Sequence, residues 1–449
     1  MGVMSRLFGT NGIRGIVNQE MTSELALKLG MATGTCFGRG SYVIGTDTRI
    51  SNQMLKNAFL SGVLSVGGDV IDIGTVPSPT LQYSVPFLEA RAGAMITASH
   101  NPPMFNGIKI IDTDGTEAER KTEEKIEDIF YRNDYALVSW DDIGQTWPMN
   151  TQGGYRKAVC SQVNKSLIQE KKFTVVLDCG NGAGSLVMPY LLRDLGCRVV
   201  SLNSHPDGLF PGRLPEPTRE TLSRLMEVVQ GANADMGVAL DGDADRAVFV
   251  DEKGGYLDGD KTLALMAHHF VSAGEKCVTP VSSSSCVSDV VNKKGGEMIY
   301  TRVGAPLVAR KMIEVSAVFG GEENGGLIFP CHQYCRDGGM AMAAMLDIMA
   351  STGKTVSQLA GELPSYFLYK TKISCSHDTQ GRILQGLIDE EDEKMDLTDG
   401  VKIFLSNGWV LVRPSGTEPL IRVYGEARDP KIAEKVAQRY LCRLREMIK

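Results

Sequence analysis

One short stretch between two apolar runs constrains more than any other how this chain folds. Residues 94–96 are apolar and predict a buried strand. Pro102 and Pro103 then prevent a helix or a strand from continuing, and a second apolar run begins at Ile108. Ser99 therefore lies on a turn directly after a strand, where catalytic nucleophiles are often placed. The alternative is that Ser99 only stabilises the turn, as serine often does.

The composition indicates an ordinary globular protein. The 449 residues are enough for several domains, and the 43% of hydrophobic and 22% of charged residues are typical values. The net charge of −7 argues against a nucleic-acid partner. No apolar run is long enough to predict a membrane helix, and the N-terminus lacks the apolar core of a signal peptide. The ten cysteines contain no C-x-x-C pair, so we expect reduced thiols in a cytoplasmic protein.

Apolar strand patterns alternate with helical patterns along the chain and predict an α/β fold. In the first part we expect helices at residues 22–38 and 51–67 and strands at residues 42–45 and 70–73. The same alternation continues to about residue 366, and a smaller unit follows. We therefore expect four domains, at residues 1–150, 151–252, 253–366 and 367–449.

The chain opens with the string F-G-T-N-G-I-R-G at residues 8–15, in which three glycines surround one cation, Arg14. Glycine lets a backbone approach a ligand closely, and a guanidinium matches the geometry of a phosphate. We therefore expect a phosphate-binding loop here. The alternative is a simple turn before the helix at residues 22–38.

A second glycine-rich string, C-G-N-G-A-G at residues 179–184, follows a predicted strand at residues 174–178. A dinucleotide site would have the spacing G-x-G-x-x-G and an acid at the end of the next strand. Here the spacing is G-x-G-x-G, and the next strand ends at Asn203. We therefore favour a tight turn that leads into a helix at residues 185–195.

Three carboxylates, Asp241, Asp243 and Asp245, alternate in the string D-G-D-A-D-R between two apolar runs. In an extended or turn conformation they face one way, and three carboxylate oxygens suit Mg²⁺. An EF-hand is the competing interpretation, but Arg246 stands where that loop needs glycine, and the flanks are predicted strands. A solvated acidic turn is the other alternative, and it does not explain aspartates between core strands.

Two further loops lie in the second half of the chain. The string G-E-E-N-G-G at residues 321–326 is polar and glycine-rich, and a surface turn or a helix N-terminus is the alternative to a binding loop. The string R-P-S-G-T-E-P offers hydroxyl groups and exposed backbone between Arg413 and Arg422, which suits a phosphate; a plain hairpin is the alternative. We expect the acidic segment at residues 389–399 to be a solvated helix face or loop.

These strings resemble the loops of the α-D-phosphohexomutases, the family of phosphoglucomutases, phosphomannomutases and phosphoglucosamine mutases. T-A-S-H-N-P followed by N-G-I-K is similar to the family's phosphoserine loop, D-G-D-A-D-R to its metal loop and R-P-S-G-T-E-P to its phosphate-binding loop. The resemblance spans essentially the whole chain. It implies three related α/β domains and a smaller C-terminal α+β domain around a central cleft.

The resemblance also implies a role for individual residues. Ser99 would carry a phosphate, and Mg²⁺ would be bound by this phosphoserine with Asp241, Asp243 and Asp245. Glu322 and Asn324 would contact the sugar, with asparagine in place of the commoner serine. The remaining roles are charge neutralisation by Arg14 and Arg246, orientation of the phosphate or proton movement by His100 and Lys109, and binding of the distal phosphate by Arg413, Ser415, Gly416, Thr417 and Arg422.

The implied reaction interconverts a sugar 6-phosphate and a sugar 1-phosphate, with Mg²⁺ as cofactor and a sugar bisphosphate as activator and intermediate. Glucosamine phosphate is the expected substrate, because F-G-T-N-G-I-R-G with G-E-E-N-G-G is most similar to archaeal-type phosphoglucosamine mutases. Glucose, mannose or pentose phosphates are the alternatives. A sugar phosphatase and a non-catalytic sugar-phosphate-binding protein are alternatives of other classes. We expect neither a nucleic-acid nor a membrane partner, and the oligomeric state, with a homodimer as one option, stays open.

Overall fold

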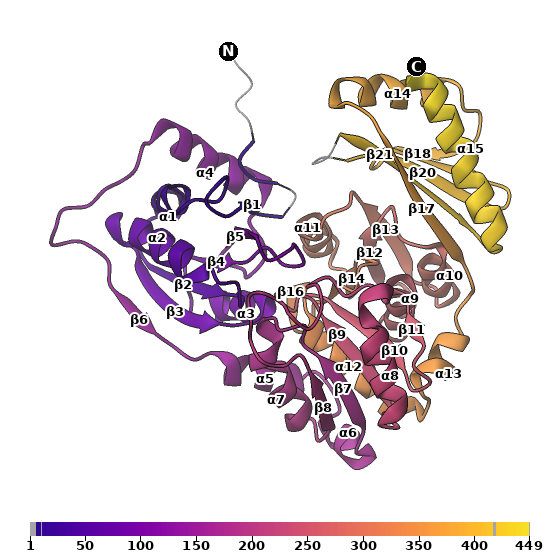
Figure 1. Ribbon diagram of the computed structural model, residues 1–449, viewed down its shortest axis with the longest axis horizontal. Helices are drawn as coiled ribbons and strands as arrows, with labels where there is room; N and C mark the ends of the chain where they lie inside the picture. Colours follow the sequence, from indigo (N-terminus) through magenta and orange to yellow (C-terminus); the bar gives the residue numbers. More distant parts are fainter. Residues whose placement is uncertain (1–5, 10, 416–418, 449) are drawn as a thin grey trace. The chain divides into compact units, whose positions relative to one another are not determined.

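The computed structural model describes residues 6–9, 11–415 and 419–448 (Figure 1). Contacts divide the chain into two compact units. The first unit contains Met1–Thr262 and Asn324–Gly361, and the second contains Leu263–Glu323 and Glu362–Lys449. The expected third domain therefore contributes residues to both units. No helix in the described residues is long and apolar enough to cross a membrane.

The first unit begins with a six-stranded sheet in the order β1-β5-β4-β2-β3-β6. Strands β4, β2, β3 and β6 are parallel to one another, whereas β5 and β1 are antiparallel additions at one edge. Its strands are β1 (Ile13–Ile16), β2 (Ser41–Thr46), β3 (Asp69–Thr75), β4 (Ala92–Ile96), β5 (Phe105–Ile111) and β6 (Thr146–Pro148). Its helices are α1 (Ser23–Phe37), α2 (Asn52–Ser65), α3 (Ser78–Phe87) and α4 (Arg120–Arg132).

Helices cover both faces of this sheet, because successive strand residues point to opposite sides. Tyr42 and Ile44 of β2 lie in one core cluster with buried residues of α1, α2 and α4. Val43 lies in a second cluster with Leu81 and Val85 of α3. A sheet covered on both faces explains why its central strands read as continuous apolar runs.

A second sheet of the first unit has the order β11-β10-β9-β7-β8. Strands β9 and β10 form an antiparallel hairpin whose connection contains the three predicted metal-binding aspartates. The strands are β7 (Thr174–Asp178), β8 (Arg198–Leu202), β9 (Met236–Leu240), β10 (Ala247–Asp251) and β11 (Tyr256–Leu257). The accompanying helices are α5 (Gln152–Cys160), α6 (Lys165–Lys171), η1 (Ala183–Leu186), α7 (Met188–Asp194), η2 (Arg219–Leu222) and α8 (Ser223–Gly231).

The first unit is completed by residues from later in the chain. The hairpin of β15 (Leu327–Phe329) and β16 (Gln333–Arg336) leads into α12 (Gly338–Thr352), which packs against α5, α6 and β10. Helix α13 (Val356–Gly361) then ends this segment.

Two expected elements differ from the structure. Residues 13–16 form strand β1 where a loop was expected, because they pair with β5, more than 80 residues later in the chain. The helix expected at residues 185–195 is divided into η1 and α7, with Val187 between them in a non-helical conformation. Pro189 lies in the first turn of α7, where its missing N–H group costs nothing, and so favours a new helix start there.

The second unit contains a parallel arrangement in which β12 (Lys276–Pro280) pairs with β13 (Glu297–Thr301) and β14 (Phe319–Gly321). Its helices are α10 (Ser285–Lys293) and α11 (Ala305–Val315), together with most of α9 (Gly259–Phe270). An antiparallel sheet in the order β17-β21-β20-β19-β18 follows. It consists of β17 (Phe367–Ser374), β18 (Met395–Asp396), β19 (Val401–Leu405), β20 (Gly408–Pro414) and β21 (Leu420–Ala427).

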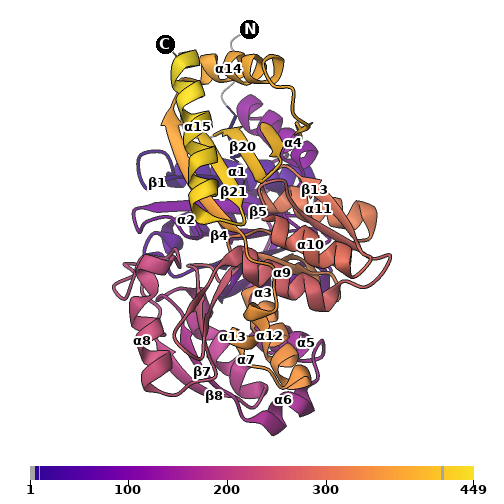
Figure 2. The same cartoon turned by 90° about the vertical axis from the view of Figure 1, so that its right-hand side faces the viewer.

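Two helices cover one face of this last sheet, α14 (His377–Asp389) and α15 (Pro430–Ile448). Figure 2 shows α15 running along β20 and β21, and buried residues such as Tyr440 and Leu444 join the strands in one core. The acidic segment that begins at Asp389 is the end of α14, a turn and the two-residue strand β18. None of its residues is buried, in agreement with a solvated segment, except that Asp399 at its end is shielded by an ion pair with Arg413.

Candidate active site

Ser99 lies on the turn after β4, within a segment that we call the serine loop (residues 97–105). Its side chain is fully buried, and its φ of 49° is in the left-handed region that non-glycine residues rarely adopt. Such a conformation costs on the order of 1–3 kcal/mol and persists only where the surroundings hold it. The Ser99 hydroxyl donates a hydrogen bond of 2.8 Å to Oδ2 of Asp241. Residues 142 positions apart in sequence are thus joined at one reactive oxygen.

The connection between β9 and β10, which we call the aspartate loop (residues 241–246), gathers three buried carboxylates. One oxygen each of Asp241, Asp243 and Asp245 lies within 4.8 Å of the others. Ala244 turns the chain between them with a φ of 57°. Among the described residues, Oδ1 of Asp243 and Oδ1 of Asp245 are buried with no hydrogen-bond partner. Buried carboxylate oxygens without partners are costly unless a cation binds them, so the donor set fits Mg²⁺.

Lys109 of β5 supplies positive charge beside these carboxylates. Its Nζ lies 2.9 Å from Oδ2 of Asp243 and 3.2 Å from Oδ2 of Asp245. Burial alone lowers the pKa of Lys109, but the attraction of Asp243, Asp245 and Glu117 outweighs it and raises that pKa. Burial and repulsion from its two neighbouring aspartates raise the pKa of Asp241. The pKa values of these groups therefore depend on the opposite and like charges around them, and the positive charge of Lys109 partly offsets the negative charge of the aspartates.

The two arginines that were expected to neutralise charge, Arg14 and Arg246, lie near the serine loop and the aspartate loop. Arg14 donates a hydrogen bond of 3.0 Å from Nη1 to Oδ1 of Asn101, and burial lowers its pKa from the usual value. The backbone N–H of Arg246 donates to Asp241, and its Nε lies 3.7 Å from Oδ1 of Asp245. The Nε atoms of both arginines are buried and make no hydrogen bond within the described residues, although that of Arg246 forms the ion pair with Asp245. These donors are available for an anionic ligand.

His100 lies beside the serine, with Nδ1 3.4 Å from the Ser99 hydroxyl oxygen. Burial, with a contribution from the nearby Arg246 and Arg14, lowers the pKa of His100 to about 3. The imidazole is therefore neutral near pH 7 and adds no charge to the site.

The aspartate loop is supported from two sides. Ser78, the first residue of α3, donates a hydrogen bond of 2.6 Å to Oδ2 of Asp243. On the other side, a Cβ atom on Gly182 would lie 2.5 Å from the carbonyl oxygen of Gly242, and the Ala183 N–H donates to the same oxygen. The glycine-rich string at residues 179–184 therefore forms the tight turn that was expected, and it packs against the aspartate loop.

Arg336 was not anticipated from the sequence. It lies on the short strand β16, and its Nη2 is 2.5 Å from Oδ2 of Asp245. Asp337 follows it and accepts a hydrogen bond from the hydroxyl of Tyr155. No motif marks this strand, and only the pairing of β15 with β16 and the packing of α12 bring it to the aspartates.

The second unit contains the expected C-terminal phosphate-binding residues that the structure describes. Arg413 and Arg422 are direct cross-strand partners in β20 and β21, and Lys372 of β17 is opposite Arg422. We call these three residues the cation row. Like charges placed directly opposite one another are unfavourable, so a row of three suits an anionic ligand. Ser415 is buried beside it, and Gly416 and Thr417 lie outside the described residues.

Two carboxylates orient this region of the second unit. Asp399 accepts from Nε of Arg413 at 2.5 Å and from the N–H of Val303 at 3.0 Å. Glu322 accepts a hydrogen bond of 3.1 Å from the N–H of Gly304, the residue that follows Val303. Lys372 and Asp399 were not identified from the sequence, since neither belongs to a recognisable string. Asn324 falls in the first unit, where its side chain accepts from the N–H of Gly326.

Family models for four consecutive domains match the chain. Their descriptions are phosphoglucomutase/phosphomannomutase alpha/beta/alpha domains I, II and III and the C-terminal domain, at residues 5–136, 153–255, 258–367 and 379–441. A phosphoglucomutase/phosphomannomutase of Thermococcus kodakarensis is 44% identical over 455 residues, which cover 99% of this chain and all of the relative. The chain belongs to the phosphoglucomutase/phosphomannomutase family.

Other family members agree with this assignment. A phosphoglucosamine/phosphogalactosamine mutase of Sulfurisphaera tokodaii is 40% identical over 445 residues, covering 96% of this chain and 98% of the relative. The crystal structure of a phosphoglucomutase/phosphomannomutase family protein from Burkholderia thailandensis has the same fold, with a TM-score of 0.87 at 24% identity over 99% of this chain and 98% of that one. The expected four-domain fold is therefore confirmed.

Proposed function

We propose that this protein is a phosphosugar mutase that transfers a phosphoryl group between Ser99 and a sugar phosphate. The supporting observation is the hydrogen bond from the Ser99 hydroxyl to Asp241, within a group of three buried aspartates. Phosphoryl transfer depends mainly on positioning and charge neutralisation. The local arrangement supplies both, since the serine is held in a fixed turn and cations surround the carboxylates.

In the proposed cycle, the phosphoserine P–O bond breaks as the phosphorus bonds to a free hydroxyl oxygen of a sugar monophosphate, and the proton of that hydroxyl ends on the released Ser99 oxygen. The other phosphate of the resulting sugar bisphosphate then returns to Ser99, which regenerates the phosphoenzyme. In the return transfer the Ser99 proton passes to the sugar oxygen that loses its phosphate. Asp241, Asp243 and Asp245 would hold Mg²⁺, which when bound would offset the charge of the transferring group. Lys109 and Arg246 would keep the carboxylates and the phosphate in place, and His100 would orient the phosphate.

The distal phosphate is the proposed ligand of the C-terminal loop, through Arg413, Ser415, Gly416, Thr417 and Arg422. Because the bisphosphate must turn around between the two transfers, this loop must accept a phosphate on either end of the sugar. The cation row supports this proposal and adds Lys372 to it. Arg14, with its unpartnered Nε, is proposed to contact the phosphate at Ser99.

We propose glucosamine phosphate as the substrate, with Glu322 and Asn324 as sugar contacts. The relative from Sulfurisphaera tokodaii carries the name of an amino-sugar phosphate mutase, which supports this choice. Glucose and mannose phosphates are the second candidates, supported by the name of the Thermococcus relative. The ratio of glucosamine phosphate to glucose phosphate turnover tests the choice. Glu322→Gln should lower this ratio, and an unchanged ratio would remove Glu322 from the specificity argument.

Phosphorus NMR of the Mg²⁺-loaded protein tests the proposed reaction. Hexosamine, hexose and pentose phosphates are supplied with a trace of the matching sugar bisphosphate. We expect signal to move between the 1-phosphate and the terminal phosphate of one sugar, and Ser99→Ala to abolish this movement. Release of inorganic phosphate alone would indicate a phosphatase. Binding without any turnover, by a protein phosphorylated on Ser99, would indicate a sugar-phosphate-binding protein.

We also propose a cytoplasmic location. The ten cysteines, all within the described residues, form no disulfide there and eight of them are at least partly buried. This pattern is typical of a reducing compartment.

A further inference from the structure

Arg49 uses its whole guanidinium to hold the serine loop. The side chain is fully buried on the turn after β2. Its Nη2 donates to the carbonyl oxygens of Ser99 at 2.9 Å and Asn101 at 2.6 Å. Its Nη1 donates to the carbonyl oxygens of Pro102 at 2.7 Å and Phe105 at 2.8 Å. Four of the five N–H groups of an arginine therefore bind the backbone of one loop.

The fifth N–H group binds the carboxylate that organises this turn. Nε of Arg49 donates to Oδ2 of Asp47 at 3.1 Å, and the Arg49 backbone N–H donates to Oδ1. Oδ2 of Asp47 also accepts from the hydroxyl of Thr97 at 2.6 Å, and this hydroxyl accepts the Ser99 N–H at 2.9 Å. The same ion pair thus holds the peptide groups on both sides of Ser99, through Arg49 on its carbonyl and through Asp47 and Thr97 on its N–H.

We propose that Arg49 is a positioning residue that holds Ser99 in its left-handed conformation for phosphoryl transfer. The inference rests on the mutase function proposed above. The guanidinium of Arg49 hydrogen-bonds to backbone carbonyl groups and to Asp47, and not to the Ser99 hydroxyl or to the carboxylates of the aspartate loop, so it acts through the backbone of the serine loop. Lysine is a poor replacement, because an ammonium has three donors on one atom and cannot reach four carbonyl groups in a plane.

The other side of the Arg49 turn contacts two loops that follow strands β7 and β8 of the second sheet of the same unit. The guanidinium lies over the ring of Phe210, 5.2 Å from its centre. The neighbouring Thr48 donates from its hydroxyl to the carbonyl of Asn181 at 3.0 Å. Asn181 belongs to the glycine-rich turn that packs against the aspartate loop. The packing is so close that a Cβ atom on the neighbouring Gly182 would lie 2.5 Å from the carbonyl oxygen of Gly242. Arg49 therefore also keeps the serine loop in register with the aspartates.

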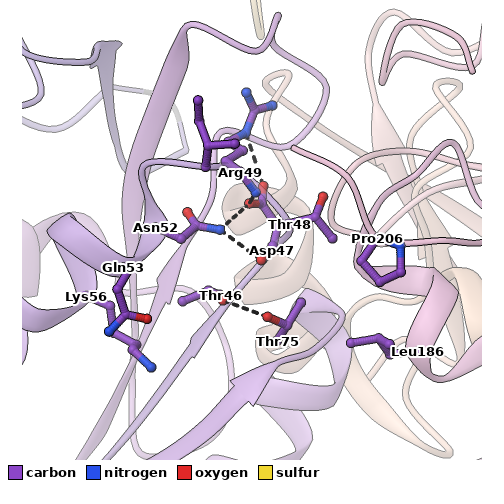
Figure 3. A pocket seen from close by; sticks show the side chains of 11 residues that line it. Thr46, Asp47, Thr48, Arg49, Asn52, Gln53, Lys56, Thr75, Leu186 and Pro206 are labelled. Carbon is purple, nitrogen blue, oxygen red and sulfur yellow. Dashed lines mark hydrogen bonds and ion pairs between the residues drawn. The ribbon is translucent and has the colours of Figure 1, made fainter. Parts of the chain in front are cut away.

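A cavity beside this ion pair makes the proposal testable by chemical rescue. It has a volume of about 270 Å³ and is lined by Asp47, Arg49, Asn52 and Pro206 among others (Figure 3). Truncation of Arg49 to alanine would add the space of the lost side chain to this cavity. Free guanidinium ion could then enter and bind Asp47 and the exposed carbonyl groups.

The experiment compares Arg49→Ala, Arg49→Lys and Arg39→Ala. Arg39 is exposed and pairs with Asp142, so its loss should leave turnover unchanged. We expect Arg49→Ala to lower kcat by about 10²-fold, the usual consequence of a misplaced reacting group, with a smaller change in KM. Arg49→Lys should recover only part of this loss. Millimolar guanidinium should raise the kcat of Arg49→Ala about tenfold, because it would restore charge-assisted hydrogen bonds to the loop. Sodium chloride at equal ionic strength should leave kcat unchanged.

A readout without turnover separates this inference from the proposed function. Amide hydrogen exchange of residues 97–105 should be faster in Arg49→Ala than in the wild type, and guanidinium should slow it again. Wild-type protein that turns over no sugar phosphate would refute the mutase function, and the exchange measurement would still test Arg49. Wild-type kcat in Arg49→Ala would overturn the inference. So would a loss of activity that follows the unfolded fraction and is not restored by guanidinium, since Arg49 would then serve stability alone.

Discussion

Replacing Lys109 with methionine should make the stability of the first unit depend on Mg²⁺. Lys109 is 2% exposed and lies 2.9 Å from Asp243 and 3.2 Å from Asp245. Two unit charges about 4 Å apart interact by about 4 kcal/mol at an effective dielectric constant of 20. Breaking a buried ion pair by removing one partner typically costs about 3–5 kcal/mol. We therefore expect a loss of about 4 kcal/mol in the free energy of unfolding when Mg²⁺ is chelated.

Added Mg²⁺ should restore much of this loss, because it brings positive charge to the same carboxylates. At a concentration one hundred times its Kd, a ligand that binds only the folded state stabilises it by about 2.7 kcal/mol. The removal of a competing cation should also tighten Mg²⁺ binding. The measurement is chemical unfolding in EDTA and in saturating Mg²⁺, with isothermal calorimetry for the Kd.

Lys56→Met is the matched control for this prediction. Lys56 forms a 2.5 Å ion pair with Asp72 in the same unit, but that pair is partly exposed, with side chains 12% and 25% accessible. We expect a smaller loss of stability and no dependence on Mg²⁺. If Lys109→Met lost equal stability in EDTA and in Mg²⁺, or bound Mg²⁺ more weakly than the wild type, the charge argument for the aspartate loop would be wrong.

Two further substitutions test other parts of the structure. Tyr155 is fully buried and donates to Asp337, and burial, then the charge of Asp337, raises its pKa well above 10. Its contribution to stability is complete below pH 10 and is lost as pH rises, by about 1.4 kcal/mol per pH unit. Tyr155→Phe should therefore flatten the alkaline limb of the stability curve, and parallel curves would contradict this. Lys372→Ala should raise KM for a sugar phosphate about tenfold by removing one charged donor while kcat changes little, as initial-rate kinetics would show; an unchanged KM would exclude Lys372 from the phosphate site.

Much of the fold follows from local pattern. The expected strands at residues 42–45 and 70–73 are parts of β2 and β3, and the expected helices at residues 22–38 and 51–67 are α1 and α2, with small shifts at their ends. These elements are long and periodic, so local propensity and tertiary packing favour the same conformation. The expectation of one continuous helix at residues 185–195 was wrong, because the helix is interrupted at Val187 and α7 begins at Met188, with Pro189 in its first turn.

The residues that hold the proposed catalytic groups are harder to predict. Arg336 and Asp399 lie in no characteristic string, and each meets its partner through a pairing of distant strands or loops. Arg49 lies in the loop that follows a predicted strand, which was a usable signal because functional loops in α/β sheets follow the strands. The role of Arg49 could still not be predicted from the sequence, because it depends on hydrogen bonds to backbone carbonyl groups 50 to 56 positions later in the chain.

The sequence by itself determined which chemistry this protein carries. Ser99, the three aspartates and the C-terminal arginines lie in short strings whose composition suits phosphate and Mg²⁺. Such strings can be recognised in the sequence without knowledge of the fold. Only the tertiary structure decided how these groups are held: Arg14 on a strand, Ser99 in a left-handed turn fixed by Asp47 and Arg49, and Arg336 against Asp245. The physical reason is that buried charges must be paired, and the partners come from whichever distant segments the sheets bring together.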